Sequence, residues 1–244
     1  MLGRVPALLV ALWVVTTQLC ENCAPTTPTS NGSDSAETRA ELERAKLLFE
    51  NGRIDHALPI LRRSLQLSPH NAEAHFLLGA AAQARSNISA ALDWYAKALA
   101  LNPTLYGAHY NTGLIYRHAK RPKLARASFN AALALRPTCA LSQNNIGLMH
   151  YFEANHTAAV RWFRRALATA ANSHVGEPKR GNATVAEVHF NLGVCLARLG
   201  QVLNAADAYA AAMKAAELAH GEDDIWVSAA MNLATLCTFV VDCQ

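Results

Sequence analysis

Small and large side chains recur along this chain with a period of 34 residues. A glycine or alanine marks each copy of the pattern, at Ala45, Gly79, Gly113, Gly147 and, after a short break, Gly193. Alanine always follows twelve residues later, and a large residue follows four residues after that, at Leu61, Tyr95, Phe129, Phe163 and Tyr209. A fixed period of this length is typical of proteins whose architecture is set by a stacked repeat and not by a catalytic motif.

Each repeat predicts two antiparallel helices. In the second repeat, Ala72 to Gln83 has helical periodicity, Arg85-Ser86-Asn87 interrupts it, and Ser89 to Leu101 resumes it. Proline closes the first three repeats at Pro69, Pro103 and Pro137, because it lacks an amide donor and clashes with the preceding turn. We expect the small residues to let two helices approach closely, and the large residue to fill the space between one helix pair and the next.

These positions resemble the tetratricopeptide repeat, which has a small residue at its eighth position, alanine at the twentieth and twenty-seventh, a large residue at the twenty-fourth and proline at the thirty-second. The resemblance covers Thr38 to Ala219 and implies an all-α fold, a right-handed α–α superhelix (tetratricopeptide-repeat solenoid) of five helix–turn–helix repeats plus a C-terminal capping helix. The repeats are expected at 38–71, 72–105, 106–139, 140–173 and 186–219.

Two segments fall outside the repeats. The insertion at 174–185 is rich in glycine, proline and charge, so we expect a loop there, with a partner-specific contact as the alternative. Residues 220–244 are expected to form the capping helix, from Asp224 to Val240, and a tail. A composition of 52% hydrophobic and 16% charged residues fits tightly stacked helices.

The amino terminus resembles a secretory signal peptide. Arg4 is followed by the apolar run Val5 to Val15 and a polar exit, which predicts a leader within 1–23; a signal anchor is the alternative. No membrane span is expected after its removal, and 24–37 should be a disordered linker. Four Asn-x-Ser/Thr sequons are possible N-glycosylation sites: Asn31, Asn87, Asn155 and Asn182. Together these features favour a glycoprotein of the secretory pathway, lumenal or extracellular.

Six cysteines add little to this picture. Cys237 and Cys243 are placed to pair if the tail turns back, whereas Cys195, inside a first helix, is expected to remain an isolated buried thiol. Cys20 and Cys23 have no second pair at zinc-ligand spacing, so no metal site is predicted.

The resemblance also implies that the first helix of every repeat lines a concave groove. Its sixth position is asparagine at Asn111, Asn145, Asn191 and, in the cap, Asn232. This is similar to the asparagine ladder in the superhelix of O-linked N-acetylglucosamine transferase, which implies that the carboxamides grip a peptide backbone. The alternative is that they bond neighbouring backbone. Other predicted groove residues are Phe76, Tyr110, Arg117, Tyr151, Phe152, Phe190 and Arg198.

Several function classes find no support. No nucleophile elbow, phosphate-binding glycine loop or carboxylate pair appears, so no enzyme activity and no cofactor are predicted. His75, His109 and His189 share the fourth repeat position, where we expect a structural role. The net charge of +4 is spread over scattered basic clusters, so no nucleic-acid partner is expected. The carboxylate clamp of chaperone-tail binders is missing, because its places hold Leu42, Lys46, Gly107 and Asn111.

The sequence therefore predicts a non-catalytic scaffold or adaptor that binds a protein or peptide segment in the concave groove, in a secretory or lumenal compartment. One alternative is a cytosolic or ciliary scaffold subunit that resembles Bardet–Biedl coat subunits. This alternative is favoured if the leader does not function. Another is a co-chaperone or enzyme accessory of the endoplasmic reticulum. The sequence indicates neither the partner nor the oligomeric state.

Overall fold

The computed structural model describes residues 36–172, 178–219 and 223–241. The predicted leader, Asn31, Cys20, Cys23 and Cys243 lie outside these ranges, and the side chains of Asn182 and Cys237 are likewise outside the description.

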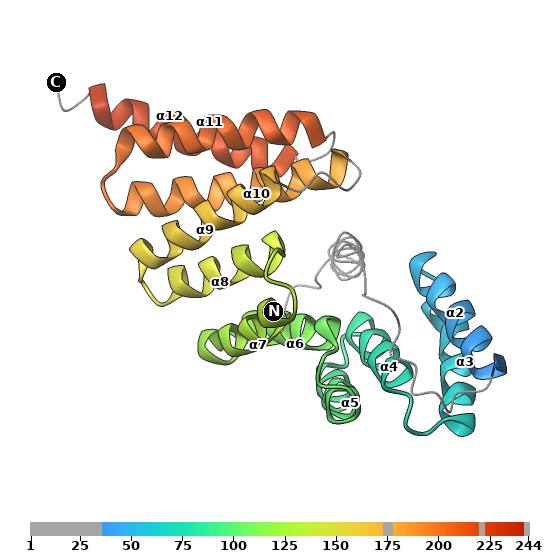
Figure 1. Ribbon diagram of the computed structural model, residues 1–244. Coiled ribbons are helices and arrows are strands. Elements are labelled where there is room, and N and C mark those ends of the chain that lie inside the picture. Colours follow the sequence, from blue (N-terminus) through green and yellow to red (C-terminus); the bar gives the residue numbers. More distant parts are fainter. Residues whose placement is uncertain (1–35, 173–177, 220–222, 242–244) are drawn as a thin grey trace, which may run out of the picture. The chain divides into compact units, whose positions relative to one another are not determined.

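The described residues form eleven α-helices and no strand (Figure 1). Their bounds are α2 (Ala36–Glu50), α3 (Ile54–Leu67), α4 (Ala72–Ala84), α5 (Ile88–Leu101), α6 (Tyr106–His118), α7 (Pro122–Leu135), α8 (Ala140–Phe152), α9 (His156–Ala171), α10 (Pro178–Arg198), α11 (Val202–Ala219) and α12 (Asp223–Val241). The helix pair predicted for the second repeat is confirmed in α4 and α5. Pro69, Pro103 and Pro137 each follow the end of a second helix, as expected.

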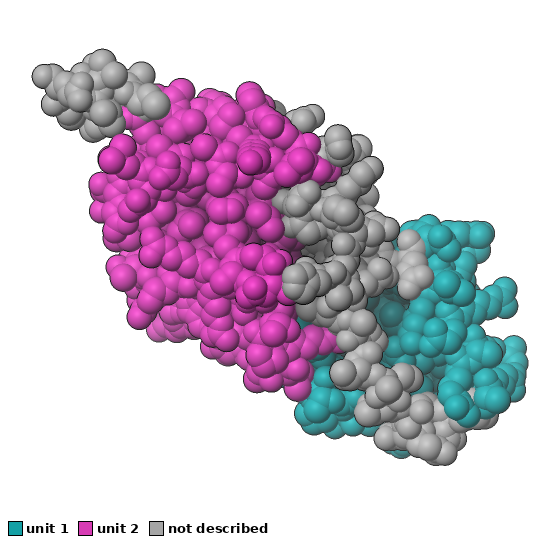
Figure 2. Space-filling model, turned by 45° about the horizontal axis from the view of Figure 1, so that its top comes forward, with its two compact units in different colours: residues 1–115 teal, residues 116–244 magenta. Residues whose placement is uncertain are grey.

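The chain divides into two compact units, residues 1–115 (unit 1) and 116–244 (unit 2), coloured separately in Figure 2. In unit 1, α2 packs against α3 and α4 against α5. In unit 2, α8 packs against α9 and α10 against α11, while α12 lies against α11 and α10. The helices thus pack as consecutive helix–turn–helix pairs, which confirms the predicted all-α solenoid class.

Each first helix ends in the same turn. The fifteenth repeat position has a positive φ of 55° to 72° in every repeat, at Gly52, Ser86, Lys120, Ala154 and Gly200. The next residue then donates its amide to the carbonyl five residues back, for example Asn155 to His150 at 2.9 Å. This is the Schellman arrangement, which satisfies carbonyls at a helix end through a left-handed residue. This turn was not predicted from the sequence.

The eighth and twenty-fourth positions of one repeat are in direct contact. A β-carbon added to Gly79 would lie 2.6 Å from the ring of Tyr95, and one added to Gly147 would lie 2.6 Å from that of Phe163. In the first repeat, where the eighth position is Ala45, the facing position holds the smaller Leu61. The large residue therefore closes its own helix pair, in addition to filling space toward the next pair as predicted.

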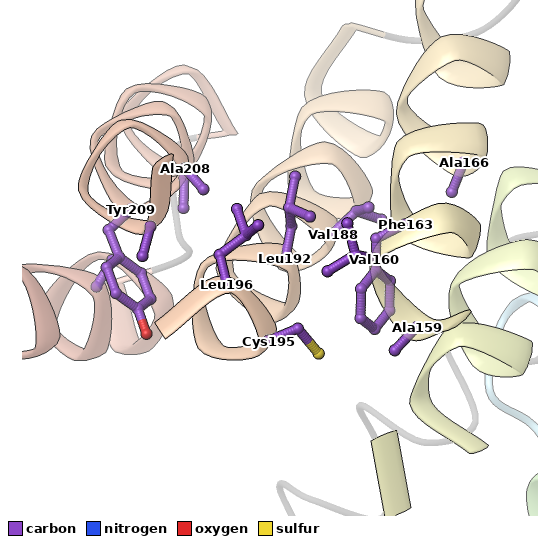
Figure 3. Close-up of a cluster of buried hydrophobic side chains, with 13 residues drawn as sticks. Ala159, Val160, Phe163, Ala166, Val188, Leu192, Cys195, Leu196, Ala208 and Tyr209 are labelled. Atoms are coloured by element: carbon purple, nitrogen blue, oxygen red, sulfur yellow. The ribbon is translucent and has the colours of Figure 1, made fainter. Parts of the chain in front are cut away.

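The core of unit 2 is built around these contacts (Figure 3). Phe163 from α9, Leu192 and Cys195 from α10, and Tyr209 from α11 belong to one buried cluster. Cys195 is a buried free thiol, as expected, and burial raises its pKa to about 11. Cys139 is also buried, and its sulfur accepts the amide of Ser142 at 3.5 Å.

The structure corrects the predicted insertion. Residues from Pro178 onward are helical and extend α10 to 21 residues, so the loop expected at 174–185 is wrong for 178–185. Proline is favoured in the first turn of a helix, where its missing amide has no intrahelical partner. The extension also has a surface to pack on, because Ala186 is buried together with Ala215 and Ala216 of α11, and α11 runs for 18 residues.

The capping helix is confirmed as α12. Ala229 is buried, and Leu233 and Leu236 pack against the core of unit 2. Trp226 and Met231 are exposed, and the Trp226 Nε1 donates to Glu217 Oε1 at 3.0 Å. Within the described ranges, no helix is both long and apolar enough to span a bilayer.

The ring–glycine contact predicts the behaviour of Gly147→Ala. Alanine gains about 1 kcal/mol in helix propensity, but overpacking against the buried Phe163 ring costs about 1–3 kcal/mol. We expect a net loss of stability, measured by chemical unfolding. The double variant Gly147→Ala/Phe163→Leu should lose less than the sum of the single variants, since leucine leaves room for a β-carbon as in the first repeat. Additive losses would show that the two positions are not coupled.

Candidate protein-binding surface

The fourth-position side chains hold the start of the first helices. The Nε2 atoms of His75 and His109 lie 3.0 Å and 2.9 Å from the carbonyl oxygens of Pro69 and Pro103. Gln143, at the same position, donates to the Pro137 carbonyl at 2.9 Å. The predicted structural role of His75 and His109 is therefore confirmed. His189 lacks this proline partner, because alanine precedes it at that distance, and burial lowers its pKa.

The first asparagine of the predicted ladder belongs to a buried network in unit 1. Asn111 is 2% exposed, and its Nδ2 donates to the Tyr95 hydroxyl at 3.1 Å. The same hydroxyl donates to Gln83 Oε1 at 2.8 Å. Burial raises the pKa of Tyr95 far above its usual value, so the hydroxyl stays protonated. Asn111 thus links α6 to α5 and α4 through a side-chain partner, whereas the alternative drawn from the sequence was a bond to neighbouring backbone.

Asn145 in unit 2 is also engaged within the chain. Its Nδ2 donates to the Leu141 carbonyl at 2.9 Å, and its Oδ1 accepts from Arg117 Nη1. The side chain is 3% exposed. Arg117 therefore serves to hold α8 in place, and both side chains are occupied in the free protein.

The remaining two asparagines are half-buried. Asn191 donates to Asn144 Oδ1 at 3.2 Å, while Asn144 donates to Glu187 Oε1 at 3.1 Å, so a polar chain joins α8 to α10. Burial raises the pKa of Tyr209, and a hydrogen bond from Asn232 acts in the opposite direction. Asn191 and Asn232 thus keep part of their surface open.

The predicted aromatic residues divide in the same way. Tyr110 is buried and stacks on Tyr106, with ring centroids 5.7 Å apart. Phe76 lies against Tyr95 with centroids 5.8 Å apart, and its ring fills the space beside Gly107. Both serve packing within unit 1.

In unit 2, Tyr151 and Phe190 are half-buried. The rings of Tyr151 and Phe152 meet edge-on, with their centroids 5.7 Å apart. The ring centroids of Phe190 and Tyr209 are 5.9 Å apart.

Exposed side chains lie on three first helices of unit 2. Phe152 at the end of α8 is 60% exposed, Met231 of α12 is 66% exposed, and Arg198 at the end of α10 is exposed. The helix α10 contacts both α8 and α12. We call this set, with Tyr151, Phe190, Asn191 and Asn232, the first-helix surface. Met231 was missed by the sequence analysis, although its place at the fifth position of an incomplete sixth repeat was a usable signal.

The two described sequon side chains are helix caps. Asn87 Oδ1 accepts the amide of Ala90 at 3.2 Å, and Asn155 Oδ1 accepts that of Ala158 at 3.1 Å. Both side chains are exposed and begin second helices, α5 and α9. These cap bonds use only the carbonyl oxygen and do not involve the amide nitrogen, the atom that a glycan would modify.

Two further features bear on possible chemistry. An open hollow of about 560 Å³ in unit 1 is lined by α3, α4 and α5, including Leu58, Arg62 and Trp94, and none of the predicted groove residues lines it. Within the part of the chain that the structure describes, no three histidine, cysteine or acidic side chains lie close enough to hold a metal ion.

The contrast between Asn111 and Asn191 yields a prediction. Asn111→Ala leaves a buried Gln83–Tyr95 pair incomplete and should lower the free energy of unfolding by about 1–3 kcal/mol. Asn191→Ala removes a partly exposed bond and should cost about 1 kcal/mol or less. Thermal and chemical unfolding of the two variants test this difference. Equal losses would contradict the assignment of Asn111 to the core.

Models of the tetratricopeptide repeat match residues 42–105 and 106–139. A search of curated protein sequences finds no significant match.

Solved structures show the same fold at low identity. MamA from Desulfovibrio magneticus superposes with a TM-score of 0.62 at 18% identity, over 75% of this chain and 97% of that one. PilF of Pseudomonas aeruginosa superposes with a TM-score of 0.61 at 20% identity, over 82% of this chain and 91% of PilF. YrrB superposes with a TM-score of 0.58 at 20% identity, over 78% of this chain and 98% of YrrB. It is described as a protein of this repeat class with an unusual peptide-binding site. The repeat spacing, the helix pairs and these matches together show that the chain belongs to the tetratricopeptide-repeat superfamily, whose fold serves as a protein-interaction scaffold.

Proposed function

We propose that the protein is a non-catalytic adaptor that holds an extended polypeptide segment against the first-helix surface of unit 2. The observation that carries the proposal is the exposure of two large apolar side chains, Phe152 of α8 and Met231 of α12. These two first helices both contact α10. Exposed apolar and aromatic side chains grouped with a few polar ones are typical of protein-binding sites.

The chemistry of the surface favours a segment with apolar side chains and open backbone groups. Phe152 and Met231 offer apolar contact, and Arg198 offers a fork of donors for a carboxylate or carbonyl. The half-buried Asn191 and Asn232 are the asparagines available to pair with a peptide backbone. Asn111 in unit 1 and Asn145 in unit 2 are left out of this surface, because each carboxamide is buried and bonded within its own unit.

The comparison with YrrB supports peptide recognition as an activity of this fold, because a peptide-binding site is named for that protein. Its identity of 20% indicates the fold alone, so the proposal depends on the side chains of this chain.

Peptides selected from a random phage-displayed library on the immobilised full chain test the proposal. We expect the double variant Phe152→Ala/Met231→Ala to weaken their binding at least about tenfold, as loss of central apolar contacts does. The matched control is Leu203→Ala/Leu218→Ala, which removes exposed leucines of the second helix α11. Isothermal titration would contradict the proposal if the control lost as much affinity, or if the double variant bound as wild type.

We further propose that the protein acts in the secretory pathway. Support comes from the apolar leader and from the placement of Asn87 and Asn155 at exposed helix starts, where a glycan is accommodated without disturbing the core.

Expression of the full chain in eukaryotic cells tests the compartment. We expect a new amino terminus after leader removal and a mass shift that peptide N-glycosidase reverses. Asn87→Gln and Asn155→Gln should each reduce the shift. Asn71→Gln is the matched control, because Asn71 caps α4 in the same way but is followed by Ala-Glu and is no sequon. An uncleaved and unglycosylated product would reject the secretory assignment.

A further inference from the structure

The positive charge of the chain is concentrated in one stretch. Residues 116–172 contain nine lysines and arginines and a single acidic residue, Glu153. Residues 36–115 contain eight lysines and arginines and seven acidic residues. Residues 178–241 contain four lysines and arginines and six acidic residues. The modest net charge of +4 therefore conceals a strongly basic block, which covers α7, α8 and α9 of unit 2.

The helix α9 presents three of these charges on one face. Arg161, Arg164 and Arg165 are spaced i, i+3 and i+4, which places them side by side on a helix. All three are exposed, opposite the buried Phe163. The guanidinium of Arg165 lies 5.2 Å from the ring centroid of Trp162, so one charge is stacked on an aromatic surface.

The helix α7 adds charge beside this face. Arg126 of α7 and Arg161 of α9 both act on His150 of α8: after burial, their charges are among the causes that lower its pKa. Glu153, which opposes this effect, accepts from Arg126 Nη1 at 2.7 Å. Arg126 Nη1 lies 3.4 Å from His150 Nδ1, and the charge of Arg161 also acts on this histidine, so basic side chains of both α7 and α9 lie near His150.

Most of these cations have no acidic partner. Across the described residues, no ion pair involves the six exposed ones, Lys120, Arg121, Lys123, Arg161, Arg164 and Arg165. In unit 1 some of the cations are paired: Arg63 with Glu37 and Glu41, and Lys46 with Glu43 and Glu73. Grouping like charges without partners costs stability through repulsion, and it attracts an oppositely charged molecule.

We propose that the outer face of α7 and α9 is a second binding surface, which takes an acidic polypeptide segment that also carries apolar side chains. The Arg126–Glu153 pair shows that a carboxylate fits among these side chains. Leu124, which is 44% exposed, and the half-buried Trp162 lie between the cations in sequence and offer apolar contact. A polypeptide with glutamate and leucine matches this mixture, whereas a uniformly charged polyanion would leave the apolar side chains without a partner.

Fluorescence anisotropy with the full chain tests this surface. The probe is a fluorescein-labelled peptide of Glu-Glu-Leu repeats, and a peptide of Glu-Glu-Ser repeats is the comparison. We expect the leucine peptide to bind more tightly, and its affinity to fall as sodium chloride is added. Arg161→Glu/Arg164→Glu/Arg165→Glu should weaken binding at least about tenfold.

The matched control is Arg39→Glu/Arg44→Glu/Arg62→Glu, which makes the same change in net charge at exposed arginines of α2 and α3. It should weaken binding less than about threefold. Circular dichroism checks that both variants stay helical. Phe152→Ala/Met231→Ala should keep full affinity for the probe, so failure of the first-helix surface and failure of this one are distinguishable.

Three results would overturn the inference. Equal losses in the two triple variants would show that only net charge matters. Equal binding of the leucine and serine peptides would remove the apolar part of the recognition. Finally, heparin or duplex DNA could bind more tightly than the leucine peptide and lose that binding in the α9 triple variant. That result would assign the face to a polyanion instead.

Discussion

The contact between a buried ring on the second helix and a bare glycine backbone on the first determines how each helix pair closes. Tyr95 against Gly79, Phe163 against Gly147 and Tyr209 against Gly193 leave no room for a β-carbon. The first repeat reaches the same closure with Ala45 and Leu61, both fully buried. A ring at this place also reaches the next first helix, as the bond between Tyr95 and Asn111 shows. Closure of one pair and attachment of the following helix therefore depend on the same side chain.

The ring of one repeat also influences the bonding partner of the asparagine on the next first helix. Where the ring carries a hydroxyl group, the following asparagine bonds to it, as Asn111 does in unit 1 and Asn232 does with Tyr209. Where the ring is Phe163, the next asparagine, Asn191, bonds instead to Asn144 and stays partly open. The asparagines of one repeat position thus have different partners. The open surface of unit 2 depends mainly on Phe152, Met231 and Arg198.

Much of the fold is predictable from the spacing of residues, because every repeat solves the same packing problem. The bounds of α4 and α5, the proline after α5 and the capping helix all follow from that periodicity. The helix over 178–185 was missed because its composition resembles a loop. It is helical since the long α11 gives it a surface on which to pack, and that contact is not visible in local sequence. Asn145 accepts a hydrogen bond from Arg117, which lies 28 residues away in the chain, so its role also could not be read from local sequence.

Hydrogen–deuterium exchange of the full chain with a bound, library-selected peptide tests the central claim most directly. If ring–glycine closure leaves the first helices to receive a partner, the peptide will slow exchange at the end of α8, along α10 and in the middle of α12, while the middle of α9 and α11 stays unchanged. Protection that appears on α9 and α11 and is missing from the first helices would contradict the account.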